Sequence, residues 1–254
     1  MIKKYSNLPR LADLHCHLDL YADPVEIINE TEKAEIYTIA VTTTPRAFKQ
    51  NSEWTKNCNY IFPALGMHPQ LVSKEGQRIE LFEQLFKETK FIGEVGLDAS
   101  PDYIQYYDLQ KEIFKRILIN CSNSGDKILT VHSLRAVEDV LSMINNFLPR
   151  DKRKIILHWF TGSLIDAQKA LDLGCYFSIN LRMAETKSGQ DLIRILPLDR
   201  ILTETDGPFL EIYGKPVKPK NVNLASRKLA AIHKISIIEM QNQIIKNLEK
   251  ILSK

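Results

Sequence analysis

The segment RLADLHCHLDLY, residues Arg10–Tyr21, places two histidines two residues apart, with one acid before them and another after them. Residues i and i+2 of a strand point to the same side of a sheet, so His15 and His17 are directed into one space. Two converging imidazoles indicate a metal ion. The alternative is a strand end whose polar residues run into a loop, and the rest of the chain has to discriminate between the two.

Outward from this segment, strand-like and helix-like stretches alternate along the whole chain. Eight short apolar segments are typical of strands: RLADLH, IYTIAVTTTP, YIFPALGMHP, KFIGEVGLD, KILTVHS, RKIILHWFTG, CYFSIN and RILTETDGP. Between them, apolar residues recur at three and four positions, as in IELFEQLF, which is helical periodicity. Gly125 and Gly174 stand where helices would end before the next strand.

Eight strand–helix repeats predict an α/β fold with a parallel sheet, closed into a (β/α)₈ TIM barrel. An open, doubly wound sheet is the main alternative. We expect residues 1–254 to form a single domain, completed by two C-terminal helices around Asn223–His233 and Ile237–Leu252.

Composition narrows the class of protein. A hydrophobic fraction of 44% is ordinary for a globular chain, and a net charge of +3 permits an anionic substrate without indicating a broad nucleic-acid surface. The four cysteines are scattered, which predicts neither a disulfide framework nor a zinc knuckle and favours a reducing compartment. The N-terminus lacks a secretory signal, and no apolar run is long enough for a bilayer span. These features predict a soluble, cytoplasmic protein.

Residues that commonly bind metals fall at the C-terminal ends of the predicted strands. They are His15, His17, His68, Glu94, Asp98, His132, His158, Glu204 and Asp206. In a barrel these ends converge on the face where catalytic residues sit. A mixed imidazole and carboxylate set suits Zn²⁺, Mn²⁺ or Mg²⁺. Because the set exceeds the needs of one four-coordinate ion, we expect two divalent ions that share a bridging carboxylate.

Each of these residues also has a structural explanation of its own. His132 or His158 alone would be a buried core histidine, and Asp206 before Gly-Pro would start a turn. Several buried carboxylates on one face need compensating charge, so separate explanations account poorly for the whole set.

The motifs DLHCHLD, GMHP, GEVGLD, HS, HWFTG and ETDGP follow one another between Asp13 and Phe209. As a set they resemble the TatD family of metal-dependent hydrolases, which belongs to the amidohydrolase-like barrels and typically consists of divalent-metal deoxyribonucleases. The resemblance implies metal ligands at His15, His17, Glu94, His132, His158 and Asp206, with Glu94 as the bridge. It groups His15, His17 and Asp206 around one ion, and His132 and His158 around the other. It also implies that His68 contacts the substrate or a water, and that Glu204 lies close by and either supports a metal ligand or handles a proton.

Three departures from the family pattern stand out. HSLR moves the arginine one place later, to Arg135, and HWFTG carries Trp159 where the family often has cysteine. The stretch GLDASPDY differs from the aromatic-rich family form. In addition, HCHLDLYADP resembles the TatD-type nuclease of a multi-gene bacterial anti-phage cluster, which implies a defence role and protein partners.

The predicted reaction is therefore hydrolysis of phosphodiester bonds, with single-stranded DNA as the expected substrate. Asp206 is the first candidate to accept the proton of the attacking water, and Glu204 is the alternative. Lys215, Lys218 and Lys220 either attract the DNA backbone or form a solvated basic loop. Trp159 and Phe160 could stack on a base, although core packing or walling of the pocket is the expected role of Phe160.

Two rival functions use the same barrel. One is an amidohydrolase or deaminase acting on a small molecule; many such enzymes bridge two metals with a lysine of the fourth strand, where this chain has Glu94 and where Lys90 precedes the strand. The other is a non-catalytic metal-binding subunit of a larger complex, against which the complete ligand set argues. The sequence does not decide which metal binds, whether the substrate is DNA or RNA, whether cleavage is endo- or exonucleolytic, or what the oligomeric state is.

Overall fold

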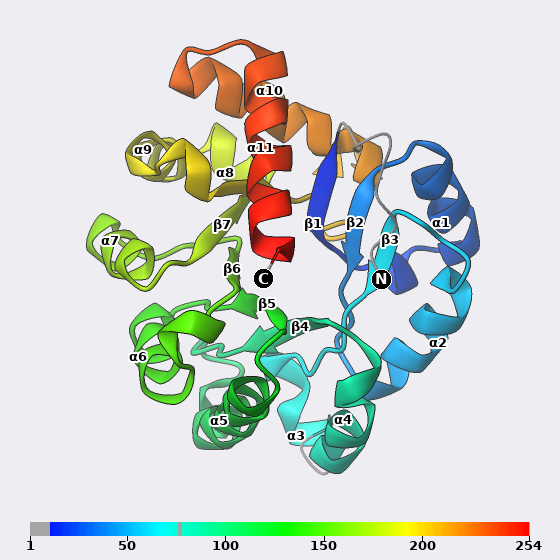
Figure 1. Cartoon of the computed structure of the whole chain (residues 1–254), viewed down its shortest axis with the longest axis vertical. Helices are drawn as coiled ribbons and strands as arrows, with labels where there is room; N and C mark the ends of the chain where they lie inside the picture. Colours follow the sequence, from blue (N-terminus) through cyan, green and yellow to red (C-terminus); the bar gives the residue numbers. More distant parts are fainter. Residues whose placement is uncertain (1–10, 76–77, 254) are drawn as a thin grey trace.

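The computed structural model describes residues 11–75 and 78–253. The N-terminal residues 1–10, where we expected no secretory signal, lie outside the described residues. Eight parallel strands form the centre of the fold: β1 (Ala12–Cys16), β2 (Tyr37–Ala40), β3 (Ile61–Pro63), β4 (Phe91–Gly96), β5 (Ile128–His132), β6 (Ile155–His158), β7 (Tyr176–Ile179) and β8 (Ile201–Thr203). The strands form a ring surrounded by helices, as Figure 1 shows. The predicted (β/α)₈ barrel is thereby confirmed.

Hydrogen bonds close the barrel at two seams. Strands β1 to β3 pair in order, as do strands β4 to β8. Leu65 bridges Ile92 in parallel and so joins the end of the first group to the second. At the other seam, the Asp206 amide donates to the His15 carbonyl at 2.9 Å, and the Thr203 hydroxyl donates to the Ala12 carbonyl at 2.6 Å.

Capping residues mark the points at which several of the outer helices begin or end. They are α1 (Pro24–Lys33), α2 (Pro45–Thr55), α3 (Val72–Glu75), α4 (Ile79–Leu85), α5 (Tyr107–Ser124), α6 (Val137–Phe147), α7 (Leu164–Asp172), α8 (Leu181–Glu185), α9 (Lys187–Ile195), α10 (Val222–His233) and α11 (Ile237–Leu252). Helix α5 ends at Gly125, whose φ of 77° suits glycine, as predicted. Helix α2 was not predicted, although Thr44 caps it by accepting from the Ala47 amide and Pro45 occupies its first turn.

Helix α11 closes the N-terminal end of the barrel. The Asn247 side chain donates to the carbonyls of Leu198 and Ile201, both at 2.7 Å, at the start of β8. At the end of the helix, the Leu252 carbonyl accepts from Lys90, which precedes β4. Figure 1 shows α11 in front of the strand ring. The opposite, C-terminal end of the strands is therefore the end available for a site.

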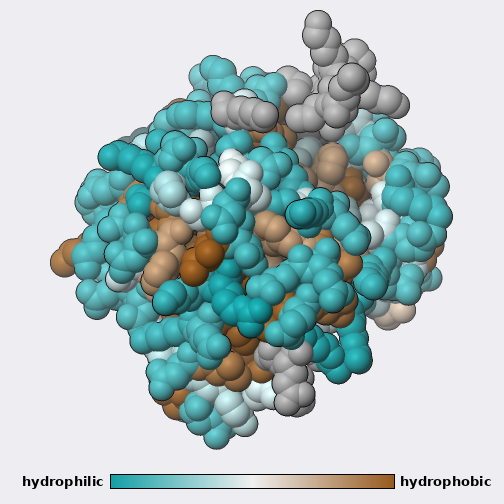
Figure 2. Space-filling model, turned by 60° about the horizontal axis from the view of Figure 1, so that its bottom comes forward, coloured by the Kyte–Doolittle hydropathy of each residue, from teal (hydrophilic) through white to brown (hydrophobic). Residues whose placement is uncertain are grey.

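Most of the core forms one cluster between the strands and the outer helices, in which the side chains of Phe82, Phe114 and Phe177 are fully buried, and a smaller cluster lies beneath α1. The surface is mainly hydrophilic, with scattered apolar residues, as Figure 2 shows for one face. No helix of residues 11–75 and 78–253 combines the length and apolar character that crossing a bilayer requires. The basic loop after β8 forms a small hairpin of β9 (Glu211–Ile212) and β10 (Lys215–Pro216).

Candidate metal centre

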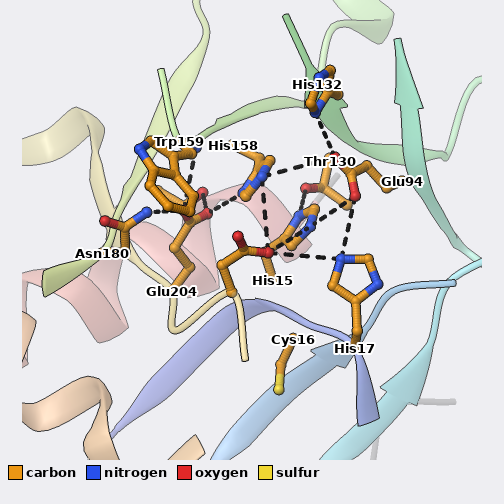
Figure 3. A network of polar contacts seen from close by, with 12 residues as sticks. His15, Cys16, His17, Glu94, Thr130, His132, His158, Trp159, Asn180 and Glu204 are labelled. Carbon is orange, nitrogen blue, oxygen red and sulfur yellow. Dashed lines mark hydrogen bonds and ion pairs between the residues drawn. The ribbon is translucent and has the colours of Figure 1, made fainter. Parts of the chain in front are cut away.

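The predicted site residues meet at the C-terminal end of the barrel. His15, His132 and His158 lie at the ends of β1, β5 and β6, whereas Glu94 lies within β4. His17, His68, Glu204 and Asp206 follow strands β1, β3 and β8 in the loops. Figure 3 shows the imidazoles and carboxylates facing one another across the mouth. The pairing register shifts in both β1 and β4 near these residues, and such irregularities re-aim side chains beside active sites.

Glu94 lies at the centre of the cluster and faces two sets of histidines. Its Oε2 atom lies 3.3 Å from the Nε2 atoms of both His15 and His17. Its Oε1 atom lies 2.8 Å from His132 Nδ1 and 3.2 Å from His68 Nε2. Glu94 is 2% exposed, and burial alone would raise its pKa, but the neighbouring imidazoles of His68 and His15 hold that pKa well below its usual value. A carboxylate in this position can contribute one oxygen to each of two ions.

The spacing of the ligand atoms fits a divalent cation. Asp206 Oδ1 lies 3.7 Å from the Nε2 atoms of His15 and His17 and 4.0 Å from that of His158. Ligands about 2.1 Å from a tetrahedral ion are separated by about 3.4 Å, close to the 3.3 and 3.7 Å found here. His15 Nε2 and Asp206 Oδ1 are buried and have no hydrogen-bond partner among the described residues, which is costly unless an ion satisfies them.

A second partner orients each of three histidines. The outward nitrogen of His15 contacts the Thr130 hydroxyl at 2.7 Å, that of His158 contacts Glu204 at 2.9 Å, and that of His132 contacts Asp98 at 2.9 Å. The inward nitrogens are thereby directed at the cluster centre, as in carboxylate–histidine–metal arrangements.

The protonation of these rings follows from their surroundings in the absence of metal. Burial lowers the pKa of His15 well below its usual value. For His132, burial is outweighed by hydrogen bonds to Asp98 and Glu94, which raise its pKa to about 9. For His158, burial is outweighed by the charges of Glu204 and Asp206, which raise its pKa to about 10. Burial also raises the pKa of Asp206, to about 7, despite the neighbouring imidazoles.

Each carboxylate oxygen of Glu204 accepts two hydrogen bonds, and one of the donors is the outward nitrogen of His158. Its Oε2 accepts from His158 Nδ1 and from the Ser178 hydroxyl, and its Oε1 accepts from the Trp159 amide at 3.2 Å and the Asn180 side chain at 2.9 Å. It is 1% exposed and does not line the pocket. This contact set favours a role in positioning His158 over the proton-accepting role that we considered from the sequence.

His68 differs from the other histidines because its Nδ1 is an acceptor. The Gln70 amide donates to His68 Nδ1 at 3.2 Å, so in the neutral ring the proton resides on Nε2. Burial lowers the pKa of His68, which favours this neutral form. His68 therefore presents an N–H group to Glu94 and to the pocket.

The grouping of the ligands differs in part from the predicted one. Groups of three closely spaced ligand atoms are His15, His17 and Glu94; His15, His158 and Asp206; and His68, Glu94 and His132. His158 stacks on His15 with ring centroids 3.6 Å apart, whereas the His132 and His158 rings are 6.3 Å apart. The shared ion of His132 and His158 stays a prediction, and Glu94 is the residue that links the two sides.

A cavity of about 410 Å³ opens onto the cluster. His17, His68, Glu94, His132, His158 and Asp206 line its base, and Leu134, Trp159 and Phe209 wall it. Arg135 is exposed and does not line this cavity.

The remaining predicted contacts with DNA are mostly engaged elsewhere. Phe160 is buried and packs on Phe177, with ring centroids 5.2 Å apart, so it belongs to the core. Lys218 and Lys220 both pair with Glu30 of α1, at 3.0 and 3.4 Å, and hold the hairpin segment against that helix. Lys215 lies exposed on β10.

Sequence reasoning missed four residues that support the site. Thr130 precedes His132 by two positions in β5, and Ser178 of β7 and Asn180, the residue after that strand, alternate with apolar residues. Polar residues at a period of two in a buried strand were the available signal. Gln70 acts through its backbone amide and through its side chain, which donates to Asp98 at 2.8 Å.

Comparisons with known proteins place this chain among metal-dependent hydrolases. A sequence model of the family described as TatD related DNase matches residues 12–253. An uncharacterized metal-dependent hydrolase of Methanocaldococcus jannaschii is 27% identical over 246 residues, covering 94% of this chain and 95% of that protein. The human deoxyribonuclease TATDN3 is 28% identical over 265 residues, covering 96% and 95%. The crystal structure of a TatD homologue from Escherichia coli shares the fold, with a TM-score of 0.80, 23% identity and coverage of 96% and 98%.

Proposed function

Because this chain belongs to the TatD family of metal-dependent hydrolases, we propose that it hydrolyses phosphodiester bonds of DNA and prefers single-stranded DNA. We propose two divalent ions, Mg²⁺, Mn²⁺ or Zn²⁺, as its cofactors. The observation that carries the proposal is Glu94, whose two oxygens face different sets of histidines. A bridging carboxylate of this kind is typical of two-metal centres that cleave phosphodiesters.

Residues of the cluster would bind the metal ions, and one of them would also accept a proton. His15, His17, Glu94 and Asp206 would hold one ion, and Glu94, His132 and His158 the other. Bound ions of this type polarise a phosphate oxygen and lower the pKa of water. Asp206 lines the pocket, and its buried Oδ1 atom has no hydrogen-bond partner in the described part of the chain, so this carboxylate is placed to accept a proton from water.

His68 and Glu204 complete the arrangement in different ways. The Nε2–H group of His68 is directed into the pocket, where it can donate to a substrate oxygen. Glu204 keeps the proton of His158 on Nδ1, so that the Nε2 lone pair faces the cluster. Neither role requires either residue to exchange a proton with the substrate.

The amidohydrolase alternative loses support from the position of Lys90. Its ammonium group donates to the Leu252 carbonyl at 2.7 Å, at the opposite end of the barrel from the cluster. A lysine held there does not reach the position of a bridging ligand, which Glu94 occupies.

The proposal is tested with protein that has been stripped of metal and then supplied with Mg²⁺, Mn²⁺ or Zn²⁺. We expect single-stranded DNA to be cleaved faster than duplex DNA or RNA, and elemental analysis to find two ions per chain. Glu94→Gln should abolish cleavage and lower the metal content. Glu83→Gln, which affects an outer ion pair with Arg116, is the matched control and should cleave normally. Cleavage by Glu94→Gln at the normal rate would refute the assignment.

We further propose that the protein acts in the cytoplasm on foreign DNA as part of a defence complex. The support for this role is the resemblance of HCHLDLYADP to anti-phage nucleases, and the four free cysteines suit a reducing compartment. The test is phage plating on the native host carrying either the wild-type gene or Glu94→Gln. Equal plaque numbers on both strains would refute the defence role without affecting the enzymatic assignment.

A further inference from the structure

A second pocket adjoins the catalytic one. It has a volume of about 330 Å³ and lies between the loop that follows β6 and helices α8 and α9. Trp159 and Thr161 line both pockets. The two pockets are therefore adjacent, and a chain molecule bound at the metal ligands lies within reach of the second pocket. Both volumes fall within the range of small-ligand sites.

The second pocket carries one uncompensated positive charge. Arg182 of α8 lines it, is exposed, and forms no ion pair with any acid in the described part of the chain. Asp191, the acid that lines the same pocket, is already paired with Lys187 and with Arg194, the latter at 2.7 Å. A free guanidinium matches a phosphate because its fork of N–H groups can bind two oxygens at once.

Trp159 supplies a rigid aromatic surface between the two pockets. Its backbone has a φ of 37°, an unfavourable value for a residue other than glycine, and its amide is tied to Glu204 at 3.2 Å. The indole meets the His158 ring edge-on, with centroids 6.3 Å apart. Figure 3 shows the indole on the side of Asn180 and Glu204, away from His17. A partly exposed ring held in this way can stack on a nucleobase.

We propose that the second pocket binds the nucleotide next to the scissile phosphodiester, with Trp159 stacked on its base and Arg182 bound to its phosphate. This inference rests on the proposed nuclease function and extends it. It explains a preference for single strands, because a base can stack on the indole only after it has left its own duplex stack. It also requires a substrate of at least two nucleotides for full affinity.

The first experiment compares a short ester with a longer chain. Thymidine 5′-(p-nitrophenyl phosphate) contains only the scissile phosphate and has no second phosphate for Arg182, whereas a single-stranded oligonucleotide supplies one. Arg182→Gln should raise KM for the oligonucleotide by about tenfold, as expected for the loss of a charge-assisted phosphate contact. The effect on the short ester should be less than twofold. Arg150→Gln is the control, because Arg150 is exposed before β6, at the other end of the barrel.

The second experiment measures binding without catalysis. The chain has two tryptophans, and Trp54→Phe leaves Trp159 as the only one. An oligonucleotide added in EDTA should quench the remaining emission, with weaker affinity in the Trp54→Phe, Arg182→Gln double variant. Equal KM changes for both substrates, or an oligonucleotide KM unaffected by Arg182→Gln, would overturn the second pocket as a subsite. If wild-type protein cleaves neither substrate, the nuclease function itself fails, and the subsite fails with it.

Discussion

Replacing Glu204 by glutamine should change which nitrogen of His158 carries the proton. In the wild-type protein, each carboxylate oxygen of Glu204 accepts two hydrogen bonds, and His158 Nδ1 is one of the donors, at 2.9 Å. Asn180 cannot turn its amide to compensate, because its own oxygen accepts from the Met183 amide. The glutamine oxygen therefore stays with Trp159 and Asn180, and its NH₂ group faces His158 Nδ1. That nitrogen must then become an acceptor, which moves the proton to Nε2, where a metal should bind.

The expected magnitude follows from the loss of one orienting partner. Removing such a partner typically lowers metal affinity or activity by about 10- to 100-fold, or about 1.4–2.7 kcal/mol. Glu204→Gln should therefore raise the Kd for Mn²⁺ or Zn²⁺, measured by calorimetry, by that factor. Ser178→Ala is the control, because it removes a donor from the same oxygen without changing the charge, and its effect should be several-fold smaller.

The assay also separates the two roles considered for Glu204. A variant that binds metal normally and loses only kcat would refute the positioning argument and restore the proton-accepting role. A variant that loses metal affinity, and recovers much of its kcat at saturating metal, supports the positioning argument. Circular dichroism checks that the fold is intact in both variants.

Three further outcomes are expected. Metal removal should lower Tm. A cation present at about 1,000 times its Kd stabilises the fold by about 4 kcal/mol, which corresponds to a change in Tm of about 8–16 °C for a chain of this size. An unchanged Tm on adding EDTA would argue against a bound cation. Gly66→Ala should lower the free energy of unfolding in urea by more than about 4 kcal/mol, because the new Cβ would lie 1.6 Å from the Thr42 carbonyl oxygen. Gly174→Ala, where nothing lies within 4 Å of the Cβ and φ is 86°, should lower it by about 1 kcal/mol. Equal urea midpoints for the two variants would contradict this packing. In the metal-free protein, the raised pKa of His158 stabilises the fold. This contribution is fully present below pH 6.5, the approximate pKa of histidine in the unfolded chain, and is lost as the pH rises to about 10. His158→Gln should flatten the dependence of unfolding free energy on pH in this range, and an unchanged dependence would exclude His158 as its source.

Local sequence was sufficient to predict the barrel and the end of it that carries the site. Strand and helix periodicities depend on near neighbours in the chain, and the ligand-type residues at strand ends needed only the geometry of a closed parallel sheet to be brought together. Among the helices that were missed, α2 was marked by Thr44 and Pro45, which are helix-start signals within a run that reads as the end of a strand.

The roles of individual atoms depended on contacts between residues far apart in the chain. Glu204 is turned toward His158 by Ser178 of β7 and by Asn180, the residue after that strand, and His15 is oriented by Thr130 of β5, 115 residues later. Lys218 and Lys220 face Glu30, nearly two hundred residues earlier. The sequence by itself therefore determined the fold, the residue types and the class of chemistry. Only the tertiary structure decided which nitrogen or oxygen faces which partner, because strand register and side-chain orientation are set jointly by elements that meet only when the barrel closes.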